Sequence, residues 1–205
     1  MADISLLMVG DLVLDEPDPD RFFDAARAVL RSGDLVVGHV ETPYTLRGRE
    51  QSGDVPAEAA DPAKLASLAR AGFHAASLAG NHVYDQGDEG VADTLAGLRE
   101  QGIAGFGAGL DLAAARAPAV LERGGKRFGF LSYNCVGPRL SWAARDKGGC
   151  AYVQVISHYE PEGANPGGPP QAFTFPVPAT MDGMQADIVA LRERVDVLVV
   201  ALHKG

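Results

Sequence analysis

Short runs of apolar and β-branched residues alternate along this chain with segments whose apolar residues recur at helical spacing. The strand-like runs cover 4–9, 34–41, 73–79, 102–107 and 195–205, and the helical segments cover 18–30, 61–72, 88–101 and 180–194. Strands that alternate with helices are typical of βαβ units, which build a parallel sheet with helices on both faces. The pattern therefore predicts an α/β fold with a mostly parallel sheet flanked by helices.

Turn and capping residues mark the limits of several of these elements. Asp61 is expected to cap the helix that follows it, and Gly72 to end that helix. Thr180 is expected to cap the last helix. The pattern of residues 119–133 predicts a hairpin that turns at Gly124-Gly125. Residues 161–180 contain too much Pro and Gly for regular structure, so they are predicted to form a long surface loop.

Composition limits the classes of function that the chain can have. Its 205 residues suffice for one well-packed domain, which we expect to span 1–205. The balance of 18 basic against 27 acidic residues argues against a nucleic-acid or anionic-membrane surface, since both require clustered Lys and Arg. No apolar run approaches the roughly 20 residues of a membrane helix, and the N-terminus lacks a signal-peptide pattern, so we expect a cytoplasmic protein.

Two cysteines and two histidines are interpreted as structural or solvated. Cys135 and Cys150 are not in a CxxC spacing, which favours structural thiols over a metal pair or a disulfide. His74 lies inside a predicted strand, and His158 lies beside the Pro- and Gly-rich segment. The GFGAG stretch at 105–109 follows a late strand, whereas a dinucleotide fingerprint opens a helix in the first βαβ unit, so a close-packed turn is favoured there.

Side chains of the kinds that bind metals follow four of the predicted strands. They are Asp11 after the first strand, His39 and Glu41 at the end of the second, Asn81 and His82 after the third, and His203 after the last. In open α/β sheets, ligands bind at the carboxyl ends of the strands. We therefore expect these side chains to converge at one edge of the sheet.

The chemistry of this set suits borderline divalent ions such as Mn, Fe or Zn. Two carboxylates with neutral ligands can hold two ions about 3.5–4 Å apart when one carboxylate bridges them. Each residue alone also has a simpler explanation: Asp11 can form a turn, Glu41 can end a strand, and Asn81 tolerates a left-handed backbone. The convergence of all of them favours a site for two divalent metal ions.

Five stretches in order along the chain resemble a known family. They are VGDLVLD (9–15), DLVVGHVETPYT (34–45), AGFHAASLAGNHVYDQGDEGVADTL (71–95), GIAGFGAG (102–109) and VDVLVVALHKG (195–205). Together they are similar to the CapA type of bacterial capsule-synthesis proteins, also called poly-γ-glutamate synthesis proteins, which have the calcineurin-like metallophosphoesterase fold. The GNH triplet at a strand end is the most specific stretch. The resemblance implies a metallophosphoesterase-like α/β sandwich with a dinuclear metal site.

The resemblance also implies roles for individual residues. Asp11 would bind the first metal and Glu41 would bridge the two. Asn81 and His203 would bind the second metal. His82 would act as general acid or stabilise the leaving oxygen, with Asp85 as its orienting partner.

The chain departs from the family's pattern in two respects. The family usually has Asn where this chain has His39, which shares a strand face with Glu41 and can therefore point toward the site and alter its metal preference. The family's pattern also continues past the His-x-Gly element to a further strand and a Gly-x-His-x-His segment. We therefore expect a domain that is incomplete at its C-terminus, as the N-terminal portion of a longer protein, a truncated product or a chain completed by a partner segment.

Three functions follow from these observations. The first is a metal-dependent hydrolase that activates water against a phosphoester. The second is an enzyme that acts on γ-glutamyl or other amide bonds in capsule polymer or peptide metabolism. The third is a non-enzymatic accessory protein. The substrate would be a small molecule or a polymer, and the segments 42–60 and 161–180 are expected to border its site.

Overall fold

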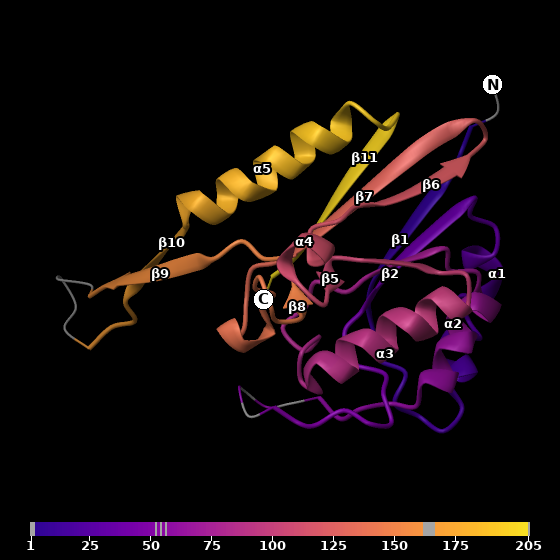
Figure 1. The fold of residues 1–205 in the computed structure, drawn as a ribbon, viewed down its shortest axis with the longest axis horizontal. Helices are drawn as coiled ribbons and strands as arrows, with labels where there is room; N and C mark the ends of the chain where they lie inside the picture. Colours follow the sequence, from indigo (N-terminus) through magenta and orange to yellow (C-terminus); the bar gives the residue numbers. More distant parts are fainter. Residues whose placement is uncertain (1–2, 52, 54, 56, 162–166, 205) are drawn as a thin grey trace.

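Two β-sheets stacked face to face form the centre of the fold, and helices cover their outer faces (Figure 1). The computed structural model describes residues 3–51, 53, 55, 57–161 and 167–204. The predicted segments 42–60, 161–180 and 195–205 each include residues outside these ranges. None of the described helices is long and apolar enough to cross a membrane.

The first sheet contains four parallel strands in the order in which they occur along the chain. They are β1 (Leu6–Leu12), β2 (Leu35–Val40), β3 (Ala75–Ser77) and β4 (Ala104–Phe106). The first strand extends further than the predicted 4–9, so Asp11 lies within it, just after an irregularity in the pairing with β2. The predicted parallel sheet is therefore confirmed.

The second sheet contains three strands in the order β11-β7-β6. The hairpin of β6 (Ala119–Arg123) and β7 (Lys126–Asn134) turns at the predicted Gly124-Gly125 pair, where both residues have positive φ. β11 (Val197–His203) runs parallel to β7. Among the described residues, β11 pairs with β7 alone and forms an edge of this sheet.

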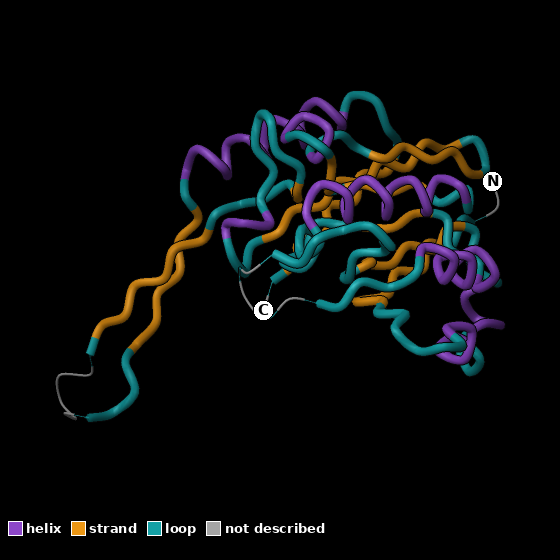
Figure 2. Tube along the Cα trace, turned by 60° about the horizontal axis from the view of Figure 1, so that its bottom comes forward, coloured by secondary structure: helices purple, strands orange, loops and turns teal. Residues whose placement is uncertain are grey.

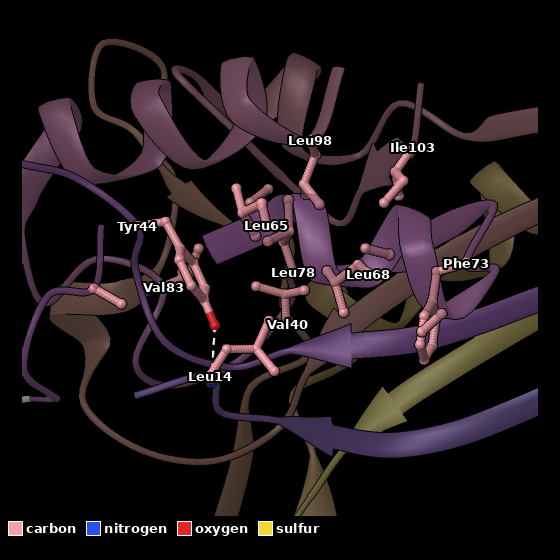
Figure 3. Close-up of a cluster of buried hydrophobic side chains, with 14 of the residues drawn as sticks. Leu14, Val40, Tyr44, Leu65, Leu68, Phe73, Leu78, Val83, Leu98 and Ile103 are labelled. Carbon is pink, nitrogen blue, oxygen red and sulfur yellow. Dashed lines mark hydrogen bonds between the residues drawn. The ribbon is translucent and has the colours of Figure 1, made fainter. Parts of the chain in front are cut away.

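Helices on the outer face of the first sheet enclose one apolar core. They are η1 (Pro19–Phe23), α1 (Arg27–Leu30), η2 (Pro62–Leu65), α2 (Ala66–Ala71) and α3 (Gly87–Glu100). Figure 3 shows Leu65, Leu68 and Leu98 packed over the sheet. The buried Tyr44 hydroxyl accepts a hydrogen bond from the Leu14 amide at 3.0 Å (Figure 3).

The second sheet has its own helix, α5 (Pro178–Arg192), on its outer side. The remaining short elements are β5 (Ala108–Gly109), α4 (Leu112–Ala115), η3 (Arg139–Ser141) and β8 (Gly149–Cys150). The layers therefore follow the order helix, sheet, sheet, helix, as expected for a metallophosphoesterase-like α/β sandwich.

The inner faces of the two sheets change from apolar to polar toward the carboxyl ends of the strands. Alternate residues of β2 point inward, so Leu35 and Val37 pack against Phe128 and Phe130 of β7. The next inward position on β2 is His39, which is buried. A histidine is thereby placed in the space between the sheets, at the end where the candidate ligands gather.

Two predictions about the helices were wrong. Residues 18–30 do not form one helix but the short elements η1 and α1. A helical pattern this short decides little by itself, and here the Asp20 carboxylate pairs with Arg27 and Arg70. Thr180 does not cap α5: its Oγ1 donates to the Val177 carbonyl at 2.8 Å, within the first turn. By contrast, Asp61 caps η2 as predicted.

The segment 161–180 is not simply a surface loop. Residues Gln171–Pro176 form β10, which pairs antiparallel with β9 (Val155–Glu160), and 178–180 begin α5. Ladder hydrogen bonds to β9 outweigh the Pro and Gly content, because the prolines lie at the ends of the strand and not within it. The hairpin projects from the body of the molecule (Figure 2). Residues 162–166 lie outside the described ranges.

Candidate metal centre

Three of the predicted ligands meet where the carboxyl ends of the two sheets come together. Asp11 on β1, His39 on β2 and His203 at the end of β11 each offer a ligand atom, and these atoms lie within 4.8 Å of one another. They line a cavity of about 180 Å³ between the sheets. The convergence of strand ends brings together residues that are far apart in the sequence.

His203 connects this cluster to the two other predicted ligands. Its Nε2 atom lies 3.0 Å from Oδ1 of Asn81 and 4.0 Å from Oε1 of Glu41. Its Nδ1 atom lies 3.9 Å from Oδ1 of Asp11. The five side chains predicted as ligands are therefore close neighbours, and His203 lies at the centre of the group.

His39 has one ring nitrogen paired and one unpaired. Its Nδ1 atom lies 3.1 Å from the Ser77 hydroxyl, whereas Nε2 is buried and has no hydrogen-bond partner among the described residues. The ring centroids of His39 and His203 are 4.5 Å apart. Burial, together with nearby His203, lowers the pKa of His39 to about 4, which keeps the imidazole neutral and able to act as a ligand.

The carboxylates of the site repel each other. Burial raises the pKa of Glu41, and the neighbouring Asp11 carboxylate raises it further, while His203 and His82 act in the opposite direction. A cation at this position would relieve the repulsion. An unpaired buried imidazole nitrogen and a set of nitrogen and oxygen donors also suit a borderline divalent ion. The residues present therefore fit the metal site that the fold implies.

His82 and Asp85 lie beside this cluster and form a pair. The Nδ1 atom of His82 lies 2.7 Å from Oδ2 of Asp85, which also accepts a hydrogen bond from the Ala57 amide at 2.6 Å. An ionised carboxylate only accepts hydrogen bonds, so Nδ1 of His82 carries the proton in this contact. The second ring nitrogen of His82 is then available for proton transfer.

The structure brings three further residues to the site. Ser77 and Ser132 line the same cavity, and their hydroxyl oxygens are 2.7 Å apart. A Cβ atom on Gly80 would lie 2.8 Å from Nε2 of His39, so a larger residue there would clash with the imidazole. In the sequence, Ser77 and Ser132 are simply serines within two apolar strands. Serines occur in such strands without a functional role, so the sequence did not single them out.

The two histidines interpreted as structural or solvated make their contacts outside this cluster. His74 accepts a hydrogen bond from the Val36 amide at 3.1 Å, and exposed His158 lies 3.4 Å from Glu160. Cys135 and Cys150 are both free thiols. The turn at Gly107 has a φ of +88° and packs closely on Ser132 and Ala79, as expected for a tight turn.

Comparison with a known structure supports the fold. The NAD nucleotidase of Haemophilus influenzae superposes with a TM-score of 0.51 at 15% sequence identity, over 98% of this chain and 34% of that protein. At this level of identity the likeness concerns the fold alone. It agrees with the metallophosphoesterase-like sandwich that the sequence predicted.

Comparison of sequences identifies the family. Two curated relatives are described as probable polyglutamine synthesis accessory proteins, from the CDC 1551 / Oshkosh and ATCC 25618 / H37Rv strains of Mycobacterium tuberculosis. Each is 28% identical over 176 residues, which cover 84% of this chain and 41% of the relative. The chain thus spans about two fifths of their length. The family described as bacterial capsule synthesis protein PGA_cap matches residues 5–205. The predicted resemblance is confirmed, and the chain belongs to the PGA_cap family of bacterial capsule synthesis proteins.

Proposed function

We propose that this chain carries a site for two divalent metal ions (Mn, Fe or Zn) and acts as a hydrolase that cleaves a phosphoester. The observation that carries the proposal is the cluster of Asp11, His39 and His203, whose ligand atoms lie within 4.8 Å of one another. The contacts of His203 with Asn81 and Glu41 extend this cluster. The fold shared with a nucleotidase is consistent with this chemistry.

The side chains divide into ligands for two ions. Asp11, His39 and His203, whose ligand atoms lie within 4.8 Å of one another, would hold one ion together with Asn81, and Glu41 would bridge to the second. This grouping of His203 with Asp11 differs from the division that the resemblance implied, in which Asn81 and His203 bind the second ion. Bound ions of this kind lower the pKa of water and offset the charge of a phosphoryl group. Each such ion takes at least about four ligands, so we propose that a further segment of the protein or a partner supplies additional donors.

His82 and Asp85 would transfer the proton. Asp85 accepts from Nδ1 of His82 and thereby orients the ring and stabilises its protonated form. The Nε2–H group of protonated His82 would then donate to the leaving oxygen of the substrate. His82 needs no contact with metal for this role, so its replacement should separate turnover from metal binding.

Metal analysis and an assay with bis(p-nitrophenyl) phosphate test this proposal together. Asp11→Asn and Glu41→Gln are expected to lose bound metal after incubation with Mn, Fe or Zn, whereas His82→Ala is expected to retain metal and lose turnover. His158→Ala, at an exposed histidine of the projecting hairpin, serves as the matched control. Retention of both metal and rate in Asp11→Asn would overturn the assignment.

A second function is favoured by the family itself. Its description concerns capsule synthesis, and the curated relatives are named polyglutamine synthesis accessory proteins. We propose as the alternative that the site acts on a γ-glutamyl or other amide bond, or serves an accessory role without turnover. Assaying γ-glutamyl-p-nitroanilide beside the phosphoester, with the metal-loaded protein, distinguishes these functions. Metal binding without turnover of either substrate would favour the accessory role.

A further inference from the structure

We propose that the buried hydroxyls of Ser77 and Ser132 form a relay that sets the tautomer of His39 and so presents its Nε2 atom as a metal ligand beside Asp11 and His203. Ser77 and Ser132 are positioning residues in this relay, because neither contacts the ion itself. The inference rests on the metal site of the proposed function and identifies what prepares that site and what decides its metal preference.

The relay joins the two sheets. Ser77 ends β3 in the first sheet, and Ser132 lies on β7 in the second. Their oxygens are 2.7 Å apart, and the Ser77 oxygen is 3.1 Å from Nδ1 of His39. The exposed fractions of Ser77, Ser132 and His39 are 4%, 2% and 8%. All three side chains are therefore largely buried, and the Ser77 hydroxyl is a partner of Nδ1 that also contacts Ser132.

The unpaired nitrogen decides between the two tautomers. When Nδ1 is protonated it donates to Ser77, Ser77 donates to Ser132, and Nε2 keeps a lone pair that a cation can bind. In the reverse tautomer, Nε2–H would be a buried donor with no acceptor among the described residues. A buried N–H without an acceptor is unfavourable. In the first arrangement the remaining hydroxyl proton is that of Ser132, which lines the cavity and can rotate toward it, so the arrangement favours the tautomer that can bind metal.

Nε2 lies on the side of the ring that faces Gly80 and the ring of His203. Gly80 has no side chain to cover this nitrogen, and the ligand atoms of Asp11 and His203 lie within 4.8 Å of the one that His39 offers. A site with two imidazoles and a carboxylate suits Zn, Co or Fe better than a site of oxygen ligands, which suits Mg or Mn. His39 would thus shift the preference of this ion toward the nitrogen-binding metals.

The tautomer can be measured without any metal. Long-range ¹H–¹⁵N correlation spectra of the metal-free chain report which histidine nitrogen is protonated, and His39→Asn identifies the His39 signals by their loss. The wild type is expected to show His39 protonated at Nδ1. Ser77→Ala is expected to shift His39 toward the Nε2–H form, and Ser77→Thr, which keeps the hydroxyl, is expected to retain the wild-type tautomer.

Titration with Co²⁺ tests the consequence for the ion, through its visible absorption bands. His39→Asn is expected to weaken binding and shift the bands. Ser77→Ala and Ser132→Ala are expected to weaken binding about 10–100-fold, as the loss of a group that orients a metal ligand commonly does. Ser77→Thr should restore it. Ser67→Ala is the matched control, because Ser67 is also fully buried and its hydroxyl donates to the Lys64 carbonyl, outside the relay. Near-ultraviolet circular dichroism checks that each variant is folded.

The outcomes separate the relay from the metal site. The relay is overturned if Ser77→Ala keeps the wild-type tautomer of His39. It is also overturned if Ser77→Ala has the Co²⁺ bands and affinity of the wild type. Absence of Co²⁺ binding by the wild type would overturn the proposed function, while the tautomer of the metal-free protein would still decide whether the serines direct His39. If Ser67→Ala weakens Co²⁺ binding as much as Ser77→Ala does, both losses reflect a lower stability of the protein, and the relay is overturned.

Discussion

The Nε2 atom of His203 lies 3.0 Å from Oδ1 of Asn81, although 122 positions separate the two residues in the sequence. One lies at the end of β11 in the second sheet, and the other follows β3 in the first. The contact exists because both strands end at the same edge of the sandwich. It joins the two sheets at the place where the candidate ligands gather.

Asn81→Ala and His203→Ala are each expected to reduce the metal bound by the chain, because each removes a proposed ligand of the same ion. Metal content after gel filtration, measured by mass spectrometry, checks this result. His74→Gln is a suitable control, since His74 bonds the Val36 amide and lies outside the site. Unchanged stoichiometry in both variants would contradict the assignment of these ligands.

Asp85→Asn is expected to lower turnover of a phosphoester about 10²–10⁴-fold while bound metal stays constant. The amide cannot stabilise a protonated His82, so proton donation to the leaving oxygen is expected to slow at every pH. Steady-state rates across pH, with metal content measured in parallel, check this prediction. Glu160→Gln, on the exposed hairpin, should match the wild type; a wild-type profile in Asp85→Asn would rule out the orienting role.

Gly80→Ala is expected to weaken Co²⁺ or Zn²⁺ binding at least about 10-fold, because its methyl group would lie 2.8 Å from Nε2 of His39. The crowding should also destabilise the fold by about 1–3 kcal/mol. Gly10→Ala is the matched control, since Gly10 also lines the cavity but a Cβ there meets nothing within 4 Å. Isothermal titration measures the affinities. Equal affinities of the two variants would show that Nε2 of His39 need not be open.

The metal-free protein is expected to lose stability as the pH falls through the range set by His39. Its pKa is about 4 in the folded protein and 6.5 in the unfolded chain, so the unfolded state takes up the proton first. The contribution of His39 is complete above pH 6.5 and is lost progressively toward pH 4. Between pH 7 and pH 4 the free energy of unfolding should therefore fall about 3 kcal/mol more for the wild type than for His39→Asn. Urea unfolding with chelator present, followed by fluorescence of the single tryptophan, measures both curves; parallel curves would contradict a buried neutral His39.

Cys150 is expected to resist alkylation by iodoacetamide at pH 8 in the folded protein. Its side chain is fully buried, and burial raises the pKa of its thiol to about 11, so little thiolate forms and none is accessible. Cys135 is only partly buried and should react first. Peptide mass mapping before and after denaturation identifies the modified thiol. Rapid labelling of Cys150 without denaturant would show that the core around it opens.

The parallel sheet and most of the candidate ligands were predictable from the sequence. The alternation of apolar runs and helical segments predicts parallel strands, and parallel strands bring their carboxyl ends to one edge. Asp11, Glu41, Asn81 and His203 could therefore be grouped by their positions after strands, before any distance was known. His82 and Asp85, three residues apart, are close enough in sequence for their pairing to be expected as well.

Other features depended on contacts between distant segments. Residues 18–30 carry a helical pattern, yet the ion pairs of Asp20 with Arg27 and Arg70 accompany two short elements in its place. The strand Gln171–Pro176 forms because β9 supplies its hydrogen-bond partners. In both cases tertiary contacts outweigh local propensity, which is weak in segments this short.

The sequence by itself determined which residues could bind metal and at which edge of the sheet they lie, because strand order and side-chain alternation follow from local pattern. Only the tertiary structure decided which groups surround His39. Its partner Ser77 contacts Ser132 across the two sheets, 55 positions away, and serines in apolar strands carry no local mark of such a contact. Stacking of the two sheets buries this contact, and a buried hydrogen bond is stronger than one exposed to water.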